Sequence, residues 1–498
     1  DTAAAIVNST TNSLPVSEEK KPLNLLDATF LVAGSMIGSG IFIVSADMSR
    51  NIGGPGWLLL MWIVAGIVTM LAALSYGELA GMFPKAGGQY VYLKEAYNPL
   101  IAFLYGWALF LVVQCGTIAA VAMAFAKYTG VLLPFFSADH LLIETGTFKL
   151  SFAQILAIGM IVFLTFINSR GIHYGRFIVR LFTSTKLLAL LGLIVLGMFF
   201  YRNTSVWQSN IDIFWSTSHL EKNAAGSWVL SNLSGLSLIT VFGVAMVGSL
   251  FSADAWNNVT FISGDIQNPK RNLPMALLIG TSIVITLYVL ANVAYLNLLP
   301  LQGNPNGTTV AQQGIQFANA DRVGTAAATM IFGNIATVLM AILIMVSTFG
   351  CNNGVILASA RVFQTMANDN LFFSSMKNNN RFGVPAVALF VQCIWSSLLC
   401  LSGKYGDLLD YVMFAVMLFY ILTIAGIFIL RKKQPDLERP YKAFGYPVLP
   451  ALYILFASAF CINLLVMKPM NAWPGLIIVL LGIPVFYYWK SRTNTVAQ

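Results

Sequence analysis

Twelve stretches of mostly apolar residues run through this chain, and each is long enough to cross a lipid bilayer. A helix needs about 20 such residues to span a hydrocarbon core of about 30 Å. We therefore expect twelve transmembrane helices, and the last dozen residues of the long eighth stretch are expected to run past the membrane on the inner side. The expected spans are 25–48, 57–79, 100–128, 152–168, 177–201, 233–262, 275–298, 325–366, 384–401, 408–430, 448–466 and 473–489.

The composition agrees with a membrane protein and excludes other classes. Hydrophobic residues make up 57% of the 498 positions and charged residues only 9%, against about 25% charged in a soluble globular domain. Disorder, a nucleic-acid-binding surface and a disulfide scaffold are excluded too, because the apolar content is high, the 28 Lys and Arg are dispersed and only 5 Cys occur. We expect contact with a lipid bilayer and with no nucleic acid.

The positive charges indicate an orientation. With an inside N-terminus, the inner loops and tails hold 19 Lys and Arg, whereas the outer loops hold 8. Loops rich in Lys and Arg stay on the cytoplasmic side. The sequence thus predicts a multi-pass protein of the cell membrane with both termini cytoplasmic.

The first expected span contains an unusual number of small residues. Residues 34–42 read GSMIGSGIF, with three Gly and two Ser in nine positions. Each Gly weakens a helix by about 1 kcal/mol relative to Ala, so the segment is a candidate to unwind. An unwound backbone is tolerated in a membrane only where it lines a cavity or meets a ligand. Close packing of helices through Gly34 and Gly38 is an equally good explanation of this segment alone.

The sixth expected span contains a second candidate break, GSLFSADAW at residues 248–256, with an acidic residue in an apolar stretch. Interruptions at corresponding positions of two halves are typical of transporters built from inverted repeats, with the binding site between the repeats. Spans one to five and six to ten would be the repeats. The amides of a half-helix that starts after Gly38 would bind a carboxylate, and freed carbonyls would bind an ammonium group, as in a zwitterion.

This reading divides the chain into six parts. We expect a polar cytoplasmic tail at 1–22, a first repeat at 23–202, an outer loop at 203–232, a second repeat at 233–430, two further spans at 431–490 and a cytoplasmic tail at 491–498.

Four segments resemble the amino acid, polyamine and organocation transporter superfamily, most closely its L-type amino acid transporter branch. They are GSMIGSGIF at 34–42, YGELAGMFPKAGGQYVYLKEAYNP at 76–99, WNNVTFISGDIQNPKRNLP at 256–274 and LRKKQPDLERPYKAFGYPVLP at 430–450. The resemblance implies an all-α integral membrane protein with the LeuT-type fold, twelve spans, a five-plus-five inverted repeat and broken first and sixth helices. It also implies sodium-independent transport or exchange of L-amino acids.

The resemblance also implies roles for individual residues. The substrate's carboxylate and amine would lie against the backbone of the first break, at Ser35, Met36, Ile37, Gly38, Ser39, Gly40 and Ile41. In the second break, Phe251 would be an aromatic gate, Ser252, Ala253 and Asp254 would line the substrate, and Asn257 would support the unwound segment.

The sequence departs from the family's pattern in several places. Ala253 replaces an aromatic residue, Asp254 adds a carboxylate, and Val416 and Met417 stand where mammalian members carry polar or aromatic residues. These differences leave the preferred substrate side chain open. The loop between spans three and four also lacks the Cys that links mammalian members to a glycoprotein heavy chain, so we expect a prokaryote-like transporter without a disulfide-linked partner.

Lys186 lies inside the fifth expected span, six residues past Arg180. Its side chain either extends back to the inner interface or takes the role that the resemblance implies. In that role its ammonium replaces sodium, binding a carbonyl near Gly34 or Ser35 and the hydroxyl of Ser347. Desolvation of the charged amine leaves a proton-carrier role open as well.

Asp254 has three candidate roles. It could cap the helix that follows the second break, contact a polar or cationic substrate, or pair with a lysine, because an uncompensated carboxylate costs several kcal/mol at this depth. Near the inner ends of the spans, we expect ion pairs between Glu78 and Lys85 and between Arg361 and Asp369.

Together these features predict a secondary transporter of neutral, small to medium L-amino acids that works by alternating access as an exchanger. A proton-coupled transporter of cationic amino acids or polyamines is the alternative, supported by Asp254. An amino-acid-sensing receptor would need a folded ligand domain, and the outer loops are short. His140, His173 and His219 lie in separate loops, so we expect no enzyme, cofactor or metal site.

Overall fold

The computed structural model describes residues 23–137, 140–145, 148–223, 226–401 and 405–496. The expected tail at 1–22 and the last two residues lie outside them. The helices are α1 (Leu25–Met36), α2 (Gly40–Asn51), α3 (Pro55–Met82), α4 (Gln89–Ala96), α5 (Pro99–Ala108), α6 (Gln114–Leu132), α7 (Phe152–Ser169), α8 (Ile172–Val195), α9 (Thr204–Asp212), α10 (Gly235–Ser252), α11 (Asn258–Phe261), α12 (Pro269–Leu298), α13 (Val310–Gln313), α14 (Val323–Phe332), α15 (Ile335–Asn368), α16 (Ala386–Cys400), α17 (Tyr405–Lys433), α18 (Val448–Met467) and α19 (Pro469–Val496).

Short 3-10 or π-helical segments and four strands complete the elements. The helical segments are η1 (Leu109–Val113), η2 (Pro134–Phe136), η3 (Leu196–Phe200), η4 (Ser263–Asp265), η5 (Asn319–Asp321) and η6 (Ser374–Met376). The strands are β1 (Leu141–Thr145), β2 (Phe148–Ser151), β3 (Ser218–Lys222) and β4 (Trp228–Asn232).

The chain is a predominantly helical, multi-pass membrane protein. Among the described residues, ten helical segments are long and apolar enough to cross a bilayer, and the bent pair α1 and α2 makes an eleventh if it counts as one span. α16, the expected ninth span, is apolar but has only 15 residues. Helix starts follow local signals: Pro55, Pro99 and Pro269 occupy first helical positions, where a missing amide costs nothing.

The expected eighth span is not one helix. α14 ends at Phe332 and is followed by Gly333, which has a φ of +63° that favours glycine, and α15 begins at Ile335. α15 has 34 residues, or about 51 Å at 1.5 Å per residue, so it is still longer than one crossing. Part of the extra length of this stretch therefore belongs to a separate short helix, which the sequence analysis missed.

The expectation of an all-α protein is wrong in two connections. β1 pairs with β2 between α6 and α7, and β3 pairs with β4 between α9 and α10, both antiparallel. Apart from these hairpins and the helices, the described part of the chain contains a single isolated bridge, between Leu23 and Ile266.

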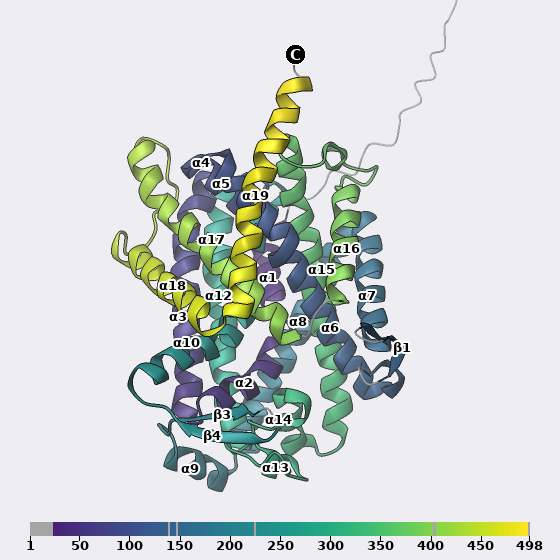
Figure 1. The fold of residues 1–498 in the computed structure, drawn as a ribbon, viewed down its shortest axis with the longest axis vertical. Helices are drawn as coiled ribbons and strands as arrows, with labels where there is room; N and C mark the ends of the chain where they lie inside the picture. Colours follow the sequence, from purple (N-terminus) through teal and green to yellow (C-terminus); the bar gives the residue numbers. More distant parts are fainter. Residues whose placement is uncertain (1–22, 138–139, 146–147, 224–225, 402–404, 497–498) are drawn as a thin grey trace, which may run out of the picture.

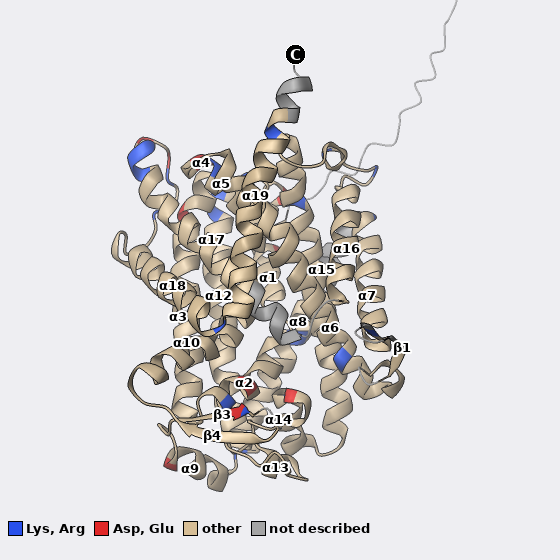
Figure 2. Cartoon of the chain, viewed as in Figure 1, with Lys and Arg blue, Asp and Glu red and all other residues tan. Residues whose placement is uncertain are grey.

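The two ends of the bundle differ (Figure 1). One end carries α4 and the C-terminal turns of α19, and we call it the terminal end. The other carries β3, β4, α9 and α13, and we call it the hairpin end. Charged residues gather toward these ends, while the middle of the bundle is mostly uncharged (Figure 2). Large apolar side chains such as Phe163, Leu188 and Leu455 are exposed on the outside of the bundle, as expected where lipid covers them.

α1 lies near the centre of the bundle (Figure 1). It packs against α8, α12 and α15, and α2 packs against α10 and α14. α12 also packs along α3. The two halves of the first broken span therefore have different neighbours, and the break lies where these neighbours meet.

Candidate functional site

The first break is shorter than the glycine-rich segment that predicted it. α1 ends at Met36 and α2 begins at Gly40, with a bend of 40° between them. Close packing occurs as well, because a Cβ on Gly34 would overlap Thr183 Oγ1. The segment therefore breaks, and close packing holds at Gly34 but not at Gly38, where a Cβ would lie 3.5 Å from Cys351 Sγ, an ordinary contact.

The second break follows α10, which ends at Ser252. Residues 253–257 leave the helix, and Ala255 has a φ of +64°, a strained conformation for a residue other than glycine. α11 then begins at Asn258. A Cβ on Gly40 would overlap Ser252 Oγ, so the two breaks lie against each other.

The carbonyls of the first break accept hydrogen bonds from three side chains on two other helices, α8 and α15. Lys186 Nζ donates to Gly34 O at 2.5 Å and to Ile37 O at 2.7 Å. Ser347 Oγ donates to Ile37 O at 3.1 Å and to Gly38 O at 3.3 Å. Cys351 Sγ donates to Ser35 O at 3.1 Å. The amides that open α2, at Gly40 and Ile41, have no carbonyl one turn earlier in their own helix.

Lys186 is buried, with 2% of its surface exposed. The interfacial position considered for its side chain is therefore wrong. Its bond to Gly34 is the expected one, but the expected bond to Ser347 is not among the described contacts. Ser347 instead donates to Ile37 O, which also accepts from Lys186. An ammonium and a hydroxyl are both donors, so both bind the carbonyls that the break leaves without a helical partner.

Tyr288 of α12 joins the two breaks, and the sequence analysis missed it. Its hydroxyl lies 3.0 Å from Met36 O and 3.1 Å from Ser252 O. Tyr295 OH donates to Ile41 O at 3.3 Å, and Ser45 Oγ donates to Asn292 Oδ1 at 2.7 Å. Residues 288, 292 and 295 share one helix face, so a polar stripe in an apolar span was the available signal.

Asp254 is bound to an aromatic hydroxyl. Tyr420 OH of α17 donates to Asp254 Oδ1 at 2.6 Å. The expected cap is wrong, because the N-cap of α11 is Asn257 and it caps without its side chain. No ion pair to Asp254 occurs within the described ranges, so pairing with a lysine is not observed.

Asn257 holds the second break through a chain of amides. Its Nδ2 donates to Gln89 Oε1 at 3.1 Å, and Gln89 Nε2 donates to Thr423 Oγ1 at 2.9 Å. This connects the break to α4 and α17. Phe251 is partly buried against the apolar core, and its role as a gate stays a prediction.

A small cavity with polar and apolar lining residues lies beside the second break. Its volume is about 20 Å³, room for about one water molecule. Asp254, Asn258 and Tyr105 are among its lining residues. The Tyr105 hydroxyl and Asn258 Nδ2 are buried without a partner in the described part of the chain, which is costly unless a ligand or water binds there.

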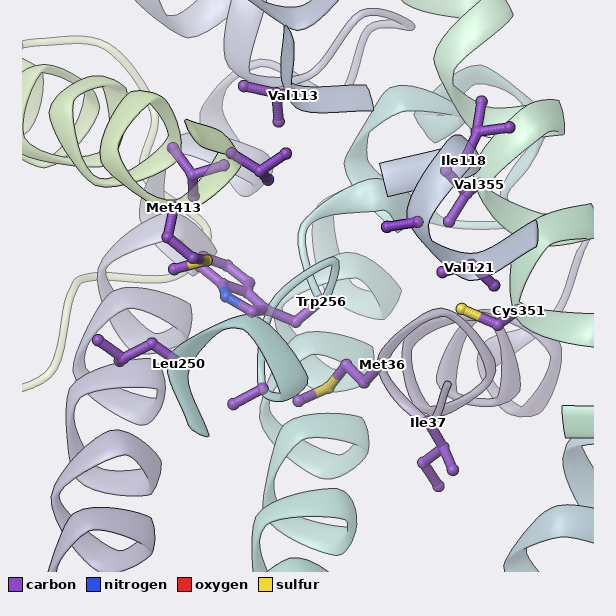
Figure 3. Close-up of a cluster of buried hydrophobic side chains, with 14 of the residues drawn as sticks. Met36, Ile37, Val113, Ile118, Val121, Leu250, Trp256, Cys351, Val355 and Met413 are labelled. Atoms are coloured by element: carbon purple, nitrogen blue, oxygen red, sulfur yellow. The ribbon is translucent and has the colours of Figure 1, made fainter. Parts of the chain in front are cut away.

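Apolar side chains fill the remaining space around the breaks (Figure 3). They come from α1, η1, α6, α10, α15, α17 and both breaks, and include Met36, Ile37, Val113, Ile118, Val121, Leu250, Trp256, Cys351, Val355 and Met413. All five cysteines are free and buried. Within the residues described, no group of His, Cys, Asp and Glu could hold a metal ion.

The ion pairs at the terminal end differ from those expected. Glu78 pairs with Arg431 at 2.7 Å and with Arg439 at 3.3 Å, not with Lys85. Asp369 pairs with Lys94 at 2.7 Å, and Arg361 lies 3.4 Å from Asp265. Both predicted pairs are therefore wrong. The sequence indicated which charged residues lie near this end, but it did not indicate which helices far apart in the chain pack together there.

The part of the chain that matches known proteins includes both breaks. Residues 23–487 match the family model described as amino acid permease. The chain is 31% identical over 478 residues to the Large neutral amino acids transporter small subunit 2 of Mus musculus, covering 95% of this chain and 82% of that protein. It is 30% identical over 482 residues to the Asc-type amino acid transporter 1 of Mus musculus, covering 96% and 83%. It is 28% identical over 476 residues to the Serine/threonine exchanger SteT of Bacillus subtilis (strain 168), covering 95% and 98%.

Proposed function

Because the chain belongs to the amino acid permease family, within the amino acid, polyamine and organocation transporter superfamily, we propose that it exchanges neutral, small to medium L-amino acids across a membrane. The names of its relatives support this substrate class, since they include a transporter of large neutral amino acids and a serine/threonine exchanger. It is a transporter rather than an enzyme, and it works by alternating access.

The observation that carries the proposal is the meeting of the two breaks at Tyr288. The substrate's carboxylate binds the amides at the start of α2, from Ser39 to Ile41, where the helix dipole favours an anion. The described carbonyls of the first break already accept from side chains. The ammonium group therefore binds mainly at the second break, at its carbonyls and the Asp254 carboxylate.

The proposed fold is the LeuT-type fold with twelve spans. α16 is the ninth span, although it is short, and α1 with α2 and α10 with α11 are the broken first and sixth spans. Residues 23–202 and 233–430 form the two inverted repeats, and residues 431–490 add the last two spans. Residues 203–232 form the outer loop.

The proposed transport needs no sodium. The buried Lys186 ammonium binds two carbonyls of the first break, which is what a bound cation would otherwise do there. Both termini, including the tails at 1–22 and 491–498, lie in the cytoplasm, and the hairpin end faces outward from the cell membrane. No disulfide-linked heavy chain is required.

A second candidate is proton-coupled transport of cationic amino acids or polyamines. It is favoured by Asp254, whose carboxylate lines the small cavity and accepts from Tyr420 but from no cation of the described chain. A substrate ammonium at the far end of a side chain would supply that missing positive charge.

The test is counterflow in proteoliposomes with a panel of L-serine, L-alanine, L-leucine, L-lysine and putrescine, with and without sodium and a pH gradient. We expect exchange of the neutral members at the same rate in sodium and in potassium. Failure of every neutral member contradicts the proposal. Uptake of L-lysine or putrescine driven by an inward proton gradient would establish the second candidate instead.

A further inference from the structure

A cavity of about 900 Å³ opens at the hairpin end. α2, α6 and α10 line it, together with strands β3 and β4. Its apolar side includes Val44, Val247 and Gly248, and Gly248 lies one turn before the second break. A Cβ on Gly248 would lie 2.9 Å from Val44 Cβ, so α2 and α10 touch closely here. We call this cavity the vestibule, and it is separate from the small cavity at the second break.

The side chains that line the vestibule carry four positive and three negative charges: Arg50, Lys127, Lys222 and Lys468 against Asp47, Glu221 and Asp321. Arg50 Nη1 donates to Asp321 Oδ1 at 2.7 Å, and Arg50 Nη2 lies 3.6 Å from Asp47 Oδ1. Lys127 and Arg322 lie near enough to interact electrostatically with this group. Asp321 is therefore already engaged by Arg50, and Lys127 adds a positive charge that Asp321 does not pair directly. Figure 2 shows charges of both signs close together beside β3.

Lys127 is the unusual member of this group. It lies on α6 near the hairpin end, is partly buried and lines the vestibule. Its ammonium has neither a hydrogen bond nor an ion pair in the part of the chain that the structure describes. A partly buried ammonium without a directly paired anion is costly, and Lys127 lines the vestibule, where a ligand can supply one.

We propose that the vestibule is a first binding site for the amino acid, in which Lys127 binds the substrate's carboxylate before it reaches the breaks. This inference rests on the proposed function and on the outward orientation of the hairpin end. Asp47, whose side chain is 69% exposed, lies on the same lining and provides an acceptor for the substrate's ammonium. A charged vestibule raises the local concentration of such a ligand and speeds its association.

The experiment measures the substrate KM separately from each face. Protein is reconstituted in one orientation, and exchange of L-serine, or of L-leucine if the panel shows it to be better, is measured with the varied concentration outside and then inside. For Lys127→Gln we expect the external KM to rise about fivefold, the upper end for a partly exposed ion pair, with the internal KM unchanged. Lys127→Arg keeps the charge and should stay within twofold of wild type.

Ionic strength supplies a second readout. Raising external salt from about 0.01 to 0.15 M shortens the screening length from about 30 to 8 Å, so the wild-type external KM should rise while that of Lys127→Gln stays constant. Lys149→Gln is the control, because Lys149 lies on β2 outside the vestibule and pairs with Glu144; its KM values should match wild type.

An unchanged external KM in Lys127→Gln, or an equal rise on both faces, overturns the inference, since a vestibule site affects one face only. An equal change of the external KM with salt in wild type and in Lys127→Gln would also overturn the inference. Failure of the proposed function is a different outcome, because the wild-type protein would then show no exchange of neutral amino acids at all.

Discussion

Replacement of Lys186 by methionine removes the ammonium and keeps a side chain of similar length. Lys186 Nζ bonds Gly34 O and Ile37 O. Ile37 O keeps a donor, Ser347 Oγ at 3.1 Å, so among the described contacts only Gly34 O is orphaned. One buried carbonyl without a donor costs about 1–3 kcal/mol. Burial of the ammonium itself destabilises the folded protein by several kcal/mol through desolvation, and methionine avoids this penalty. The two effects oppose each other, so the net change in the free energy of unfolding should be small.

Transport should change far more than stability. The two bonds of Lys186 tie α8 to the first break, and the amides that start α2 depend on that break for their position. We expect Lys186→Met to exchange L-serine at least about tenfold more slowly, a barrier increase of about 1.4 kcal/mol. The assay is counterflow in proteoliposomes, with thermal melting of the purified protein measured in parallel.

The matched control is Thr185→Val, one residue earlier on α8. The Thr185 hydroxyl bonds Leu181 O within its own helix and does not contact the break, so exchange should stay at the wild-type rate. Exchange at the wild-type rate in Lys186→Met, with an unchanged melting temperature, would refute the reasoning, because the break would then keep its function without the ammonium.

Three further substitutions test other parts of the site. Tyr288→Phe removes the hydroxyl between the two breaks but keeps the edge contact with Trp62, so exchange should slow severalfold without a loss of melting temperature; an effect no larger than that of Tyr295→Phe would argue against the bridge. Asp254→Asn preserves an acceptor for Tyr420, so folding should persist while the competition profile of amino acids shifts; an unchanged profile would leave Asp254 a purely structural role. Glu78→Gln leaves two partly buried guanidinium groups without their carboxylate and should lower stability by about 2–3 kcal/mol, measured by thermal or chemical melting; wild-type stability would show that the arginines are adequately solvated.

The contacts of some residues in the candidate site could be predicted from the sequence, and those of others could not. Glycine content alone left the first segment open between a break and close packing, and the second interruption at a corresponding position favoured two breaks that belong together. Lys186 was predicted to bind near Gly34, and it does so. The second carbonyl of Lys186 could not be predicted, because it depends on how far the chain unwinds, and only residues 37–39 of the glycine-rich segment lie outside α1 and α2.

Asp254 illustrates a different limit. Local rules favoured a helix cap, since a carboxylate stood just before the expected half-helix. The helix instead begins later, at Asn258, and the carboxylate turns to Tyr420. A residue 166 positions away in the sequence thus decided the role of Asp254, and no pattern around Asp254 indicated it.

The sequence by itself determined the features that arise from local energies: apolar length sets the membrane spans, and glycine, proline and capping residues set where helices start and weaken. Only the tertiary structure decided which charges meet. Glu78 and Arg431 are 353 positions apart, and Lys85, the nearer choice in sequence, is not the partner. An ion pair or a shared carbonyl depends on the distance between packed helices, which many weak contacts across the whole bundle set together, and the residues flanking each group do not encode it.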